Sequence, residues 1–272
     1  MEKKLRILVI MAHPDDSDIN CGGLALKYTQ KGHIVKFVST TNGGTGHYKI
    51  GGIELIRRRY EEAQNSAKVA KLYEYQILDW HTGELEPIVE KRKVIIKIIR
   101  DFIPDLIITH RPYDYHPDHR YTSQLVQDAS YILTVPNMLP LTEYLKEQPV
   151  ICYSYDGFKK PLLFQADIVI GIDDVIDKKL EMLHCHTSQM YEWLPFNEGK
   201  LDEIPKNEKD RKKYLFNTRF SLYKEIANKY REKLVELYGE KGKVIKYAEA
   251  FEISEYGKQI EKEEIFKLFP FF

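Results

Sequence analysis

Two short clusters of histidine and aspartate stand far apart in this 272-residue chain. The first reads His-Pro-Asp-Asp at residues 13–16, and the second reads His-Pro-Asp-His at residues 116–119. Imidazole nitrogens and carboxylate oxygens are ligands of zinc in hydrolytic sites, where three protein ligands leave a fourth position for water. Together the clusters supply three such ligands and leave a carboxylate and an imidazole for proton transfer. This inventory indicates a hydrolytic metal site.

Three of these residues, His13, Asp16 and His119, complete a ligand set of two imidazoles and one carboxylate. Zinc, one ion per chain, is the cofactor that such a set predicts, and iron(II) accepts the same donors. Asp15 is adjacent to a ligand in the sequence but is not needed as one. We therefore expect Asp15 to accept the proton of the metal-activated water as a general base.

His116 lies three residues before a proposed ligand and is expected to face the same cavity. There its imidazole would stabilise an oxyanion or protonate a leaving amine, and Asp118 is the candidate partner that orients its ring. A simpler interpretation is that residues 116–119 only begin a helix through residues 123–133, because such residues are common at helix starts. The catalytic interpretation is favoured because a structural turn rarely needs so many titratable groups.

Apolar, β-branched runs alternate along the chain with segments of helical periodicity. We expect strands at residues 7–11, 34–39, 75–78, 106–109, 150–154 and 168–171, and helices at residues 22–30, 54–70, 89–102, 174–184 and 220–237. The strand segments are hydrophobic throughout rather than at alternate positions, which is typical of a parallel sheet buried on both faces. The sequence therefore predicts an α/β fold, in which helices flank a mostly parallel sheet in a Rossmann-like, three-layer arrangement.

No linker or internal repeat divides the chain, so residues 1–272 are expected to form one domain. Its C-terminal segment, residues 240–272, is expected to add a strand and an apolar tail that packs on the domain or on a neighbouring chain. Each histidine–aspartate cluster follows a predicted strand, the second after a short loop. Because open parallel sheets bind ligands outside the carboxyl ends of their strands, we expect the two clusters to converge on one point.

The composition argues against nucleic acid or an anionic membrane as the partner, because Lys plus Arg and Asp plus Glu both number 41. Cys21, Cys152 and Cys185 are too few and too widely spaced for a disulfide framework, which favours a cytoplasmic location. Arg6 interrupts the apolar run near the N-terminus, so no signal peptide is expected. No segment has the length and apolarity needed to span a bilayer.

At the two clusters the chain resembles the zinc-dependent de-N-acetylases of the PIG-L or LmbE-like type. The family pattern is Ala-His-Pro-Asp-Asp-Glu near the start and His-Pro-Asp-His later, and this chain has Ala-His-Pro-Asp-Asp-Ser at residues 12–17 and the second motif unchanged. The resemblance implies the three metal ligands and the general base proposed above, and it implies transition-state stabilisation by His116. Ser17 replaces the usual glutamate, which is not a ligand in the family pattern.

The resemblance covers most of the chain, with further landmarks at residues 21–23, 59–63, 186–189 and 247–251. It implies that Arg59 binds substrate, although an arginine in the run 57–59 is also typical of a solvated helix face. Residues 78–85 resemble a family turn in which an aspartate commonly holds sugar hydroxyls, but Thr82 stands at that position. Asp79 and His81 are the candidates to replace that aspartate, unless the substrate differs.

The expected function is hydrolysis of an acetyl group from the amide of an N-acetylglucosamine-type sugar or sugar conjugate. The expected partner is therefore a small N-acetylated sugar, and family habit together with the apolar tail favours a homo-oligomer. One alternative is a non-catalytic, metal-containing module that binds a sugar or nucleotide. A second is a non-haem iron(II) oxygenase, since two histidines and one carboxylate also form its facial triad.

Overall fold

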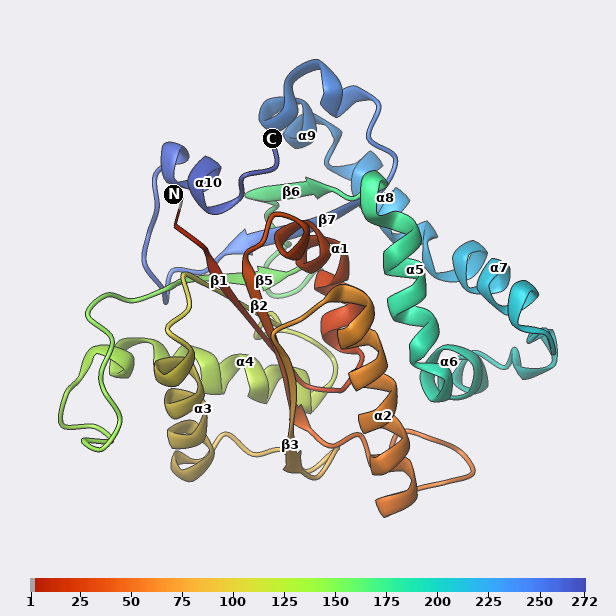
Figure 1. Cartoon of the computed structure of the whole chain (residues 1–272), viewed down its shortest axis with the longest axis horizontal. Helices are drawn as coiled ribbons and strands as arrows, with labels where there is room; N and C mark the ends of the chain where they lie inside the picture. The colour runs from red at the N-terminus through yellow and green to blue at the C-terminus, as the bar shows by residue number, and fades with distance from the viewer. Residues whose placement is uncertain (1–2) are drawn as a thin grey trace.

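A computed structural model describes residues 3–272 and contains one seven-stranded sheet in the order β3-β2-β1-β4-β5-β7-β6 (Figure 1). The strands are β1 (Arg6–Met11), β2 (Ile34–Thr41), β3 (Glu74–Trp80), β4 (Leu106–Thr109), β5 (Val150–Ser154), β6 (Ile168–Gly171) and β7 (Ala248–Ile253). The pairs from β3 to β5 are parallel, and β7 runs antiparallel to both of its neighbours. The predicted α/β fold with a mostly parallel sheet is confirmed.

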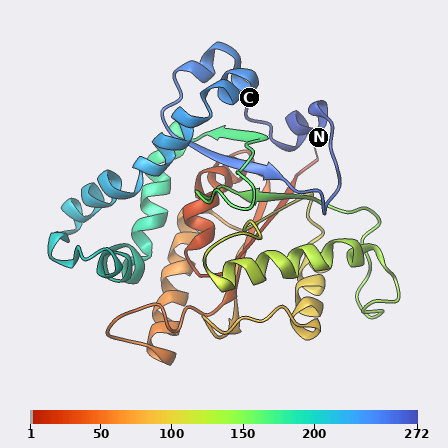
Figure 2. The same cartoon turned by 180° about the vertical axis from the view of Figure 1, so that it is seen from behind.

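Helices cover both faces of the sheet, as Figures 1 and 2 show. One face carries α1 (Asp16–Gln30), α2 (Gly52–Ala70) and α5 (Ile176–Cys185), and the other carries α3 (Val89–Phe102) and α4 (Pro117–Ser130). Successive side chains of β1 point to opposite faces, so that Val9 packs under the first group of helices and Leu8 under the second. Burial on both sides explains why the strand sequences are hydrophobic throughout.

Both histidine–aspartate clusters are helix starts. Helix α1 begins at Asp16 rather than at the expected residue 22, and α4 begins at Pro117, within the second cluster. His116 is the N-cap of α4 and its ring accepts a hydrogen bond from the Asp118 N–H. The structural interpretation of the second cluster is therefore correct, and it does not exclude a chemical role for the same residues.

The C-terminal half contains shorter helices than the sequence predicts. The segment expected as one helix at 220–237 is divided into α8 (Ser221–Lys229) and α9 (Arg231–Tyr238), and the remaining helices are α6 (Leu194–Asn197), α7 (Glu208–Arg219) and α10 (Lys262–Leu268). The apolar tail packs on its own chain, because Phe269 is fully buried and the Leu268 carbonyl accepts a hydrogen bond from Tyr28 Oη. No helix within residues 3–272 is long and apolar enough to cross a membrane.

A buried ion pair from the C-terminal half enters the middle of α1. The carboxylate of Glu249, on β7, accepts hydrogen bonds from the N–H groups of Gly23 and Leu24 at 2.7 and 2.8 Å. The Ile19 carbonyl, which the Gly23 N–H would meet in a regular helix, accepts from Lys179 Nζ at 2.8 Å. Lys179 is in turn paired with Glu249, and both side chains are at most 2% exposed. The ion pair therefore forms hydrogen bonds with backbone groups that apolar side chains at these positions would leave unpaired.

This arrangement predicts that Gly23 tolerates no side chain. A Cβ at residue 23 would lie 2.6 Å from Ile172 Cγ2 and 2.9 Å from Glu249 Oε1. Gly23→Ala is therefore expected to lower the free energy of unfolding by about 1–3 kcal/mol, the usual effect of overpacking. Urea unfolding of both proteins measures the difference.

The neighbouring glycine provides the control. A Cβ on Gly22 would meet Met182 Cε at 3.5 Å, an ordinary contact. Gly22→Ala should therefore leave the stability unchanged or raise it, because alanine is the better helix former. Equal stability losses for the two substitutions would contradict the proposed crowding at residue 23.

Candidate metal centre

The two clusters meet where the strand order of the sheet reverses. Strands β1 and β4 are adjacent and parallel, with Ile7 opposite Leu106. The chain leaves β1 toward β2 on one side, whereas it leaves β4 toward β5 on the other. Loops that depart in opposite directions open a crevice at the carboxyl ends of the strands, and ligands of doubly wound sheets bind in such crevices. The helix starts at Asp16 and Pro117 both lie at this crevice.

The three predicted ligands lie in contact with one another. His13 Nδ1 is 3.2 Å from Asp16 Oδ2, His119 Nε2 is 3.3 Å from the same oxygen, and the two nitrogens are 3.1 Å apart. Ligand atoms placed about 2.0–2.2 Å from a tetrahedral zinc ion stand roughly 3.3 Å from each other. The triangle of donor atoms therefore fits a single divalent cation and leaves room for a fourth ligand.

A second carboxylate orients each ligand histidine. Asp114 Oδ2 lies 3.0 Å from His119 Nδ1, and Asp118 Oδ2 lies 3.2 Å from His13 Nε2. Each contact occupies one ring nitrogen and directs the other toward the centre, as carboxylates behind metal-binding histidines commonly do. Asp118 contacts His116 as expected, but it does so through its backbone N–H, whereas its carboxylate faces His13 from the first turn of α4. Asp114 was not predicted, although an acidic residue two positions before a histidine cluster is a usable signal.

His110 lies among the ligands but is not suited to be one. Its Nε2 is 3.4 Å from Asp16 Oδ2 and accepts a hydrogen bond from the Ala12 N–H at 3.0 Å, which occupies the lone pair that a metal would need. Its ring stacks on that of His119 with the centroids 4.0 Å apart. Burial, together with the neighbouring His119, lowers the pKa of His110 to about 4. We therefore assign it a packing role that sequence analysis did not predict.

The centre has a strong preference for positive charge. Burial alone would lower the pKa of His119, but the carboxylates of Asp16 and Asp114 raise it to about 10. Burial is likewise outweighed at His13, whose pKa is raised by Asp16 and by a hydrogen bond to Asp118. The pKa of Asp16 lies well below its usual range because His119 and His13 outweigh its burial. The same field that holds these protons would stabilise a divalent cation in their place.

Asp15 is held by Arg59 at the edge of the centre. Asp15 is 5% exposed, and one of its carboxylate oxygens accepts a hydrogen bond from Arg59 Nη2. Arg59 is only 2% exposed, so the alternative that it lies on a solvated helix face is wrong. A Cβ on Gly43 would lie 2.7 Å from Arg59 Cδ, so the loop after β2 can approach the guanidinium only with glycine there. Arg59 is therefore fixed from two sides.

His116 lies against the ligand histidines without joining the triangle. Its ring centroid is 4.6 Å from that of His13 and 5.0 Å from that of His119. Its Nδ1 accepts from the Asp118 N–H at 3.2 Å, so the neutral ring carries its proton on Nε2. Burial and the two neighbouring histidines lower the pKa of His116. The ring is therefore a neutral hydrogen-bond donor at the edge of the centre.

Thr82 does not offer a sugar-binding group. It is 7% exposed, and its hydroxyl donates to Thr41 Oγ1 and accepts from the Gly43 N–H. Of the two residues expected to replace it, Asp79 accepts a hydrogen bond from Asn42 Nδ2 at 3.0 Å, and His81 lies 3.4 Å from Glu84 at the surface. The turn instead supports the metal centre, because the Gly83 N–H donates to Asp118 at 2.7 Å.

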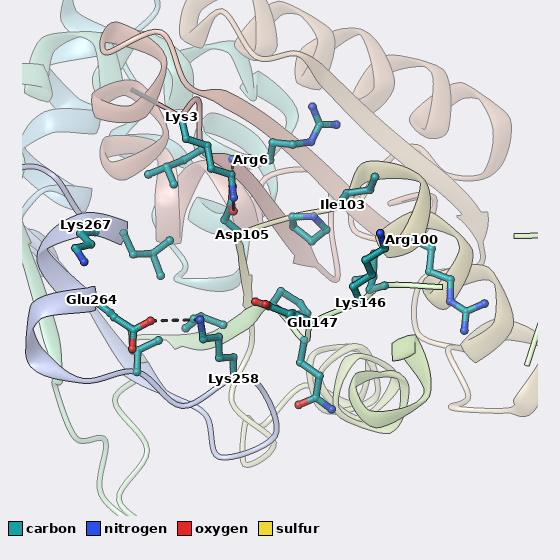
Figure 3. A pocket seen from close by; sticks show the side chains of 18 of the residues that line it. Lys3, Arg6, Arg100, Ile103, Asp105, Lys146, Glu147, Lys258, Glu264 and Lys267 are labelled. Atoms are coloured by element: carbon teal, nitrogen blue, oxygen red, sulfur yellow. Dashed lines mark hydrogen bonds and ion pairs between the residues drawn. The ribbon is translucent and has the colours of Figure 1, made fainter. Parts of the chain in front are cut away.

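A hollow of about 690 Å³ lies away from this centre (Figure 3). Its lining includes Arg6, Asp105 and Val150, which are at the opposite ends of β1, β4 and β5 from the metal ligands. The charged side chains that line it are partly paired with one another, as Lys258 is with Glu264 at 3.3 Å. The candidate metal centre therefore does not lie in this hollow.

Comparison with known proteins agrees with this architecture. Residues 8–130 match the family model described as PIG-L: GlcNAc-PI de-N-acetylase. The diacetylchitobiose deacetylase of Thermococcus kodakarensis is 32% identical over 203 residues, which are 70% of this chain and 74% of that protein. The structure of N,N′-diacetylchitobiose deacetylase from Pyrococcus horikoshii has a TM-score of 0.72 at 24% identity, covering 92% of this chain and 84% of that one.

The same fold also occurs with a different reaction. The structure of GalB, the 4-carboxy-2-hydroxymuconate hydratase of Pseudomonas putida, has a TM-score of 0.72 at 16% identity and covers 95% of this chain and 98% of that one. Fold and site together define a Rossmann-like α/β protein with a candidate metal centre of two histidines and one carboxylate. The matches in sequence go further, and the chain belongs to the PIG-L de-N-acetylase family.

The position of Asp114 predicts a measurable effect on metal affinity. Asp114→Asn removes the charge behind His119 while it keeps the shape of the side chain, and it should weaken metal binding by roughly tenfold to a hundredfold. Competition with a fluorescent chelator measures the affinity. Asp101→Asn is the control, because Asp101 pairs with Lys97 on the exposed surface of α3. An unchanged affinity in Asp114→Asn would remove Asp114 from the centre.

The raised pKa values predict that metal binding expels protons. In the metal-free protein His119 has a pKa of about 10 and is protonated at neutral pH, so a metal ligated by its Nε2 must displace that proton. Affinity should therefore rise about tenfold per pH unit for each proton released, and this gain should end as the pH reaches that pKa. Titration calorimetry in two buffers of different ionisation enthalpy counts the protons, and identical heats in both would contradict the assignment.

Proposed function

We propose that this protein is a metal-dependent hydrolase that removes the acetyl group from the amide of an N-acetylglucosamine-type sugar or sugar conjugate. The observation that carries the proposal is the triangle of His13, Asp16 and His119 donors. His116 is also close enough to His13 and His119 to reach an ion, but we assign it and Asp15 to proton transfer and oxyanion stabilisation rather than to metal binding. A closed structural metal site would more often use four protein ligands. The deacetylase from Thermococcus kodakarensis, which matches most of this chain, supports the same reaction.

His13, Asp16 and His119 would hold the ion. A divalent cation in such a site supplies Lewis acidity, which lowers the pKa of water to near 7 and polarises a carbonyl group. Asp114 and Asp118 would keep both imidazoles in the tautomer that presents a lone pair to such an ion. The contribution of the chain is therefore to hold the three donors in place before the ion binds.

Asp15 is the group proposed to take the proton of the attacking water. Arg59 Nη2 binds one oxygen of its carboxylate, and the other oxygen has no hydrogen-bond partner within residues 3–272. The guanidinium fixes the direction of that free oxygen, so proton transfer needs no rotation of the side chain. Asp15 can afterwards hand the proton to the amine that leaves.

His116 is the group proposed to stabilise the developing oxyanion. The lowered pKa keeps its ring neutral, and the Asp118 N–H on Nδ1 places the proton on Nε2. A fixed N–H that points to the position of developing negative charge is typical of oxyanion stabilisation. The alternative that His116 protonates the leaving amine would need a protonated ring, which the lowered pKa disfavours, so Asp15 is the group proposed to deliver the proton that it took from water.

The two alternative functions have less support. A non-catalytic binding module gives no reason for Asp15 and His116 to lie unligated beside the donor triangle. An iron(II) oxygenase would use the same donors, but the matched relatives named deacetylases use this fold for a different class of reaction. Acetate release by zinc-loaded protein without oxygen separates deacetylation from the oxygenase reaction.

We also propose that zinc, one ion per chain, is the native metal, and that residues 1–272 form one domain, since all seven strands join one sheet. The three unpaired cysteines support a cytoplasmic location. The apolar tail packs on its own chain and does not support a homo-oligomer. We propose a homo-oligomer from the habit of the family and from exposed apolar side chains such as Leu141, Leu162 and Leu163.

The test is acetate release from N-acetylglucosamine and N,N′-diacetylchitobiose by zinc-loaded protein. Chelation of the metal should abolish turnover. Asp15→Asn keeps an acceptor for Arg59 but removes the base, so it should retain one metal per chain and lose about 10²–10⁴ in kcat.

Asp101→Asn, which changes an exposed aspartate of the same kind, serves as the control and should retain full turnover. Absence of acetate release from every N-acetylated sugar would refute the proposed function. Full turnover in metal-loaded Asp15→Asn would refute only the role of Asp15.

A further inference from the structure

Three polar side-chain atoms lie around the side of Gly46 on which a Cβ would stand. A Cβ placed on Gly46 would lie 3.4 Å from Arg59 Nη1, 3.8 Å from Trp193 Nε1 and 4.0 Å from Gln189 Oε1. Gly46 belongs to the loop after β2, Arg59 to α2, and Gln189 and Trp193 to the turn that follows α5. The group is adjacent to the metal centre, because Arg59 also binds Asp15 through Nη2.

None of the three atoms has a hydrogen-bond partner within the described part of the chain. The side-chain amide of Gln189 donates its NH2 group to the Gly46 carbonyl at 3.1 Å and to Ser188 Oγ at 3.4 Å. This leaves Oε1 free to accept, while Arg59 Nη1 and Trp193 Nε1 are free to donate. Arg59 and Gln189 are 2% and 3% exposed, so an unused donor and an unused acceptor lie close together in a nearly buried position. Such groups favour a ligand that can both donate and accept.

Aromatic rings border this group of atoms. The ring of Trp193 stacks on Phe196 with centroids 5.8 Å apart, and Phe196 stacks on Tyr48 at 4.5 Å. The stack therefore continues from the polar group toward the surface, where Phe196 is 44% exposed. Residues Gln189–Trp193 form a π-helical turn, a conformation frequent at functional sites. Flat apolar rings beside a few convergent polar groups are typical of small-molecule sites.

We propose that Arg59 Nη1, Trp193 Nε1 and Gln189 Oε1 form a subsite that binds one hydroxyl group of the sugar whose acetamide lies at the metal centre. A hydroxyl donates one hydrogen bond and accepts two, which matches one free acceptor and two free donors. The subsite would bind a sugar hydroxyl in place of the family aspartate, a role that the buried Thr82 cannot fill. This proposal rests on the proposed function, because it assigns the sugar to the same crevice.

Gly46→Ala tests the subsite by filling it. The added methyl group would occupy the point where the three atoms converge, and its closest contact of 3.4 Å allows the chain to fold without displacement. The KM for N-acetylglucosamine should rise at least about tenfold, the effect of losing two or more hydrogen bonds, and metal content should stay at one ion per chain. Gly51→Ala is the matched control in the same loop, because its Cβ would meet only the Gly44 carbonyl at 3.5 Å.

Trp193→Phe tests one hydrogen bond while it keeps an aromatic ring in the stack. It should raise the KM for N-acetylglucosamine about threefold to tenfold. An unchanged KM in both Gly46→Ala and Trp193→Phe would overturn the subsite. A KM that rises equally in the Gly51→Ala control would also overturn it, because the effect would then come from the loop.

Direct binding separates this proposal from the proposed function. If the wild-type protein releases no acetate, the proposed hydrolysis fails, and titration calorimetry of N-acetylglucosamine into the zinc-loaded protein still tests the subsite. Weaker binding to Gly46→Ala than to wild type and Gly51→Ala, by the same factor of at least about ten, would support it. Equal binding to all three proteins, or no binding to wild type, would overturn it.

Discussion

One carboxylate oxygen connects the two halves of the metal centre. Asp16 Oδ2 lies within 3.4 Å of nitrogens of His13, His110 and His119, and it also accepts a hydrogen bond from the His13 N–H at 2.7 Å. A buried carboxylate is stable only with positive charge or donors around it. The fold meets this need by placing Asp16 at the start of α1, opposite the loop that follows β4. Asp16 is surrounded by donors because of the reversal of strand order, the two helix starts and the outer carboxylates.

Much of the fold and of the ligand set could be predicted from the sequence. Strands buried on both faces have a continuous apolar signal, which is why β4, β5 and β6 have the predicted bounds. The ligands were predictable because each motif follows such a strand, and topology alone brings the carboxyl ends of β1 and β4 together. Helix starts were harder to predict, because the helical periodicity of the sequence becomes visible only after the motif residues that begin the helix.

Contacts between distant segments could not be predicted in the same way. The contact of Asp118 with its sequence neighbour His116 was predicted, whereas the contact of its carboxylate with His13, across the crevice, was not. Gln189 and Trp193 reach the site only because α5 packs against α2, which carries Arg59. The position of Thr82 in the family turn did not predict its contacts, because its hydroxyl is hydrogen-bonded to Thr41 and Gly43 inside the protein. A hydratase of 16% identity has the same fold, so the fold alone does not determine the reaction.

The ion pair inside α1 has a consequence for the order in which the protein can mature. Helix α1 carries the Asp16 ligand near the start of the chain, but the carboxylate that satisfies its Gly23 and Leu24 N–H groups arrives with Glu249. During synthesis, all residues up to the last strand must leave the ribosome before these amides find their partner. The helix that holds the Asp16 ligand therefore gains these two contacts only after β7 has been synthesised. A chain truncated before β7 would retain both histidine–aspartate motifs and lack the carboxylate that binds the middle of α1.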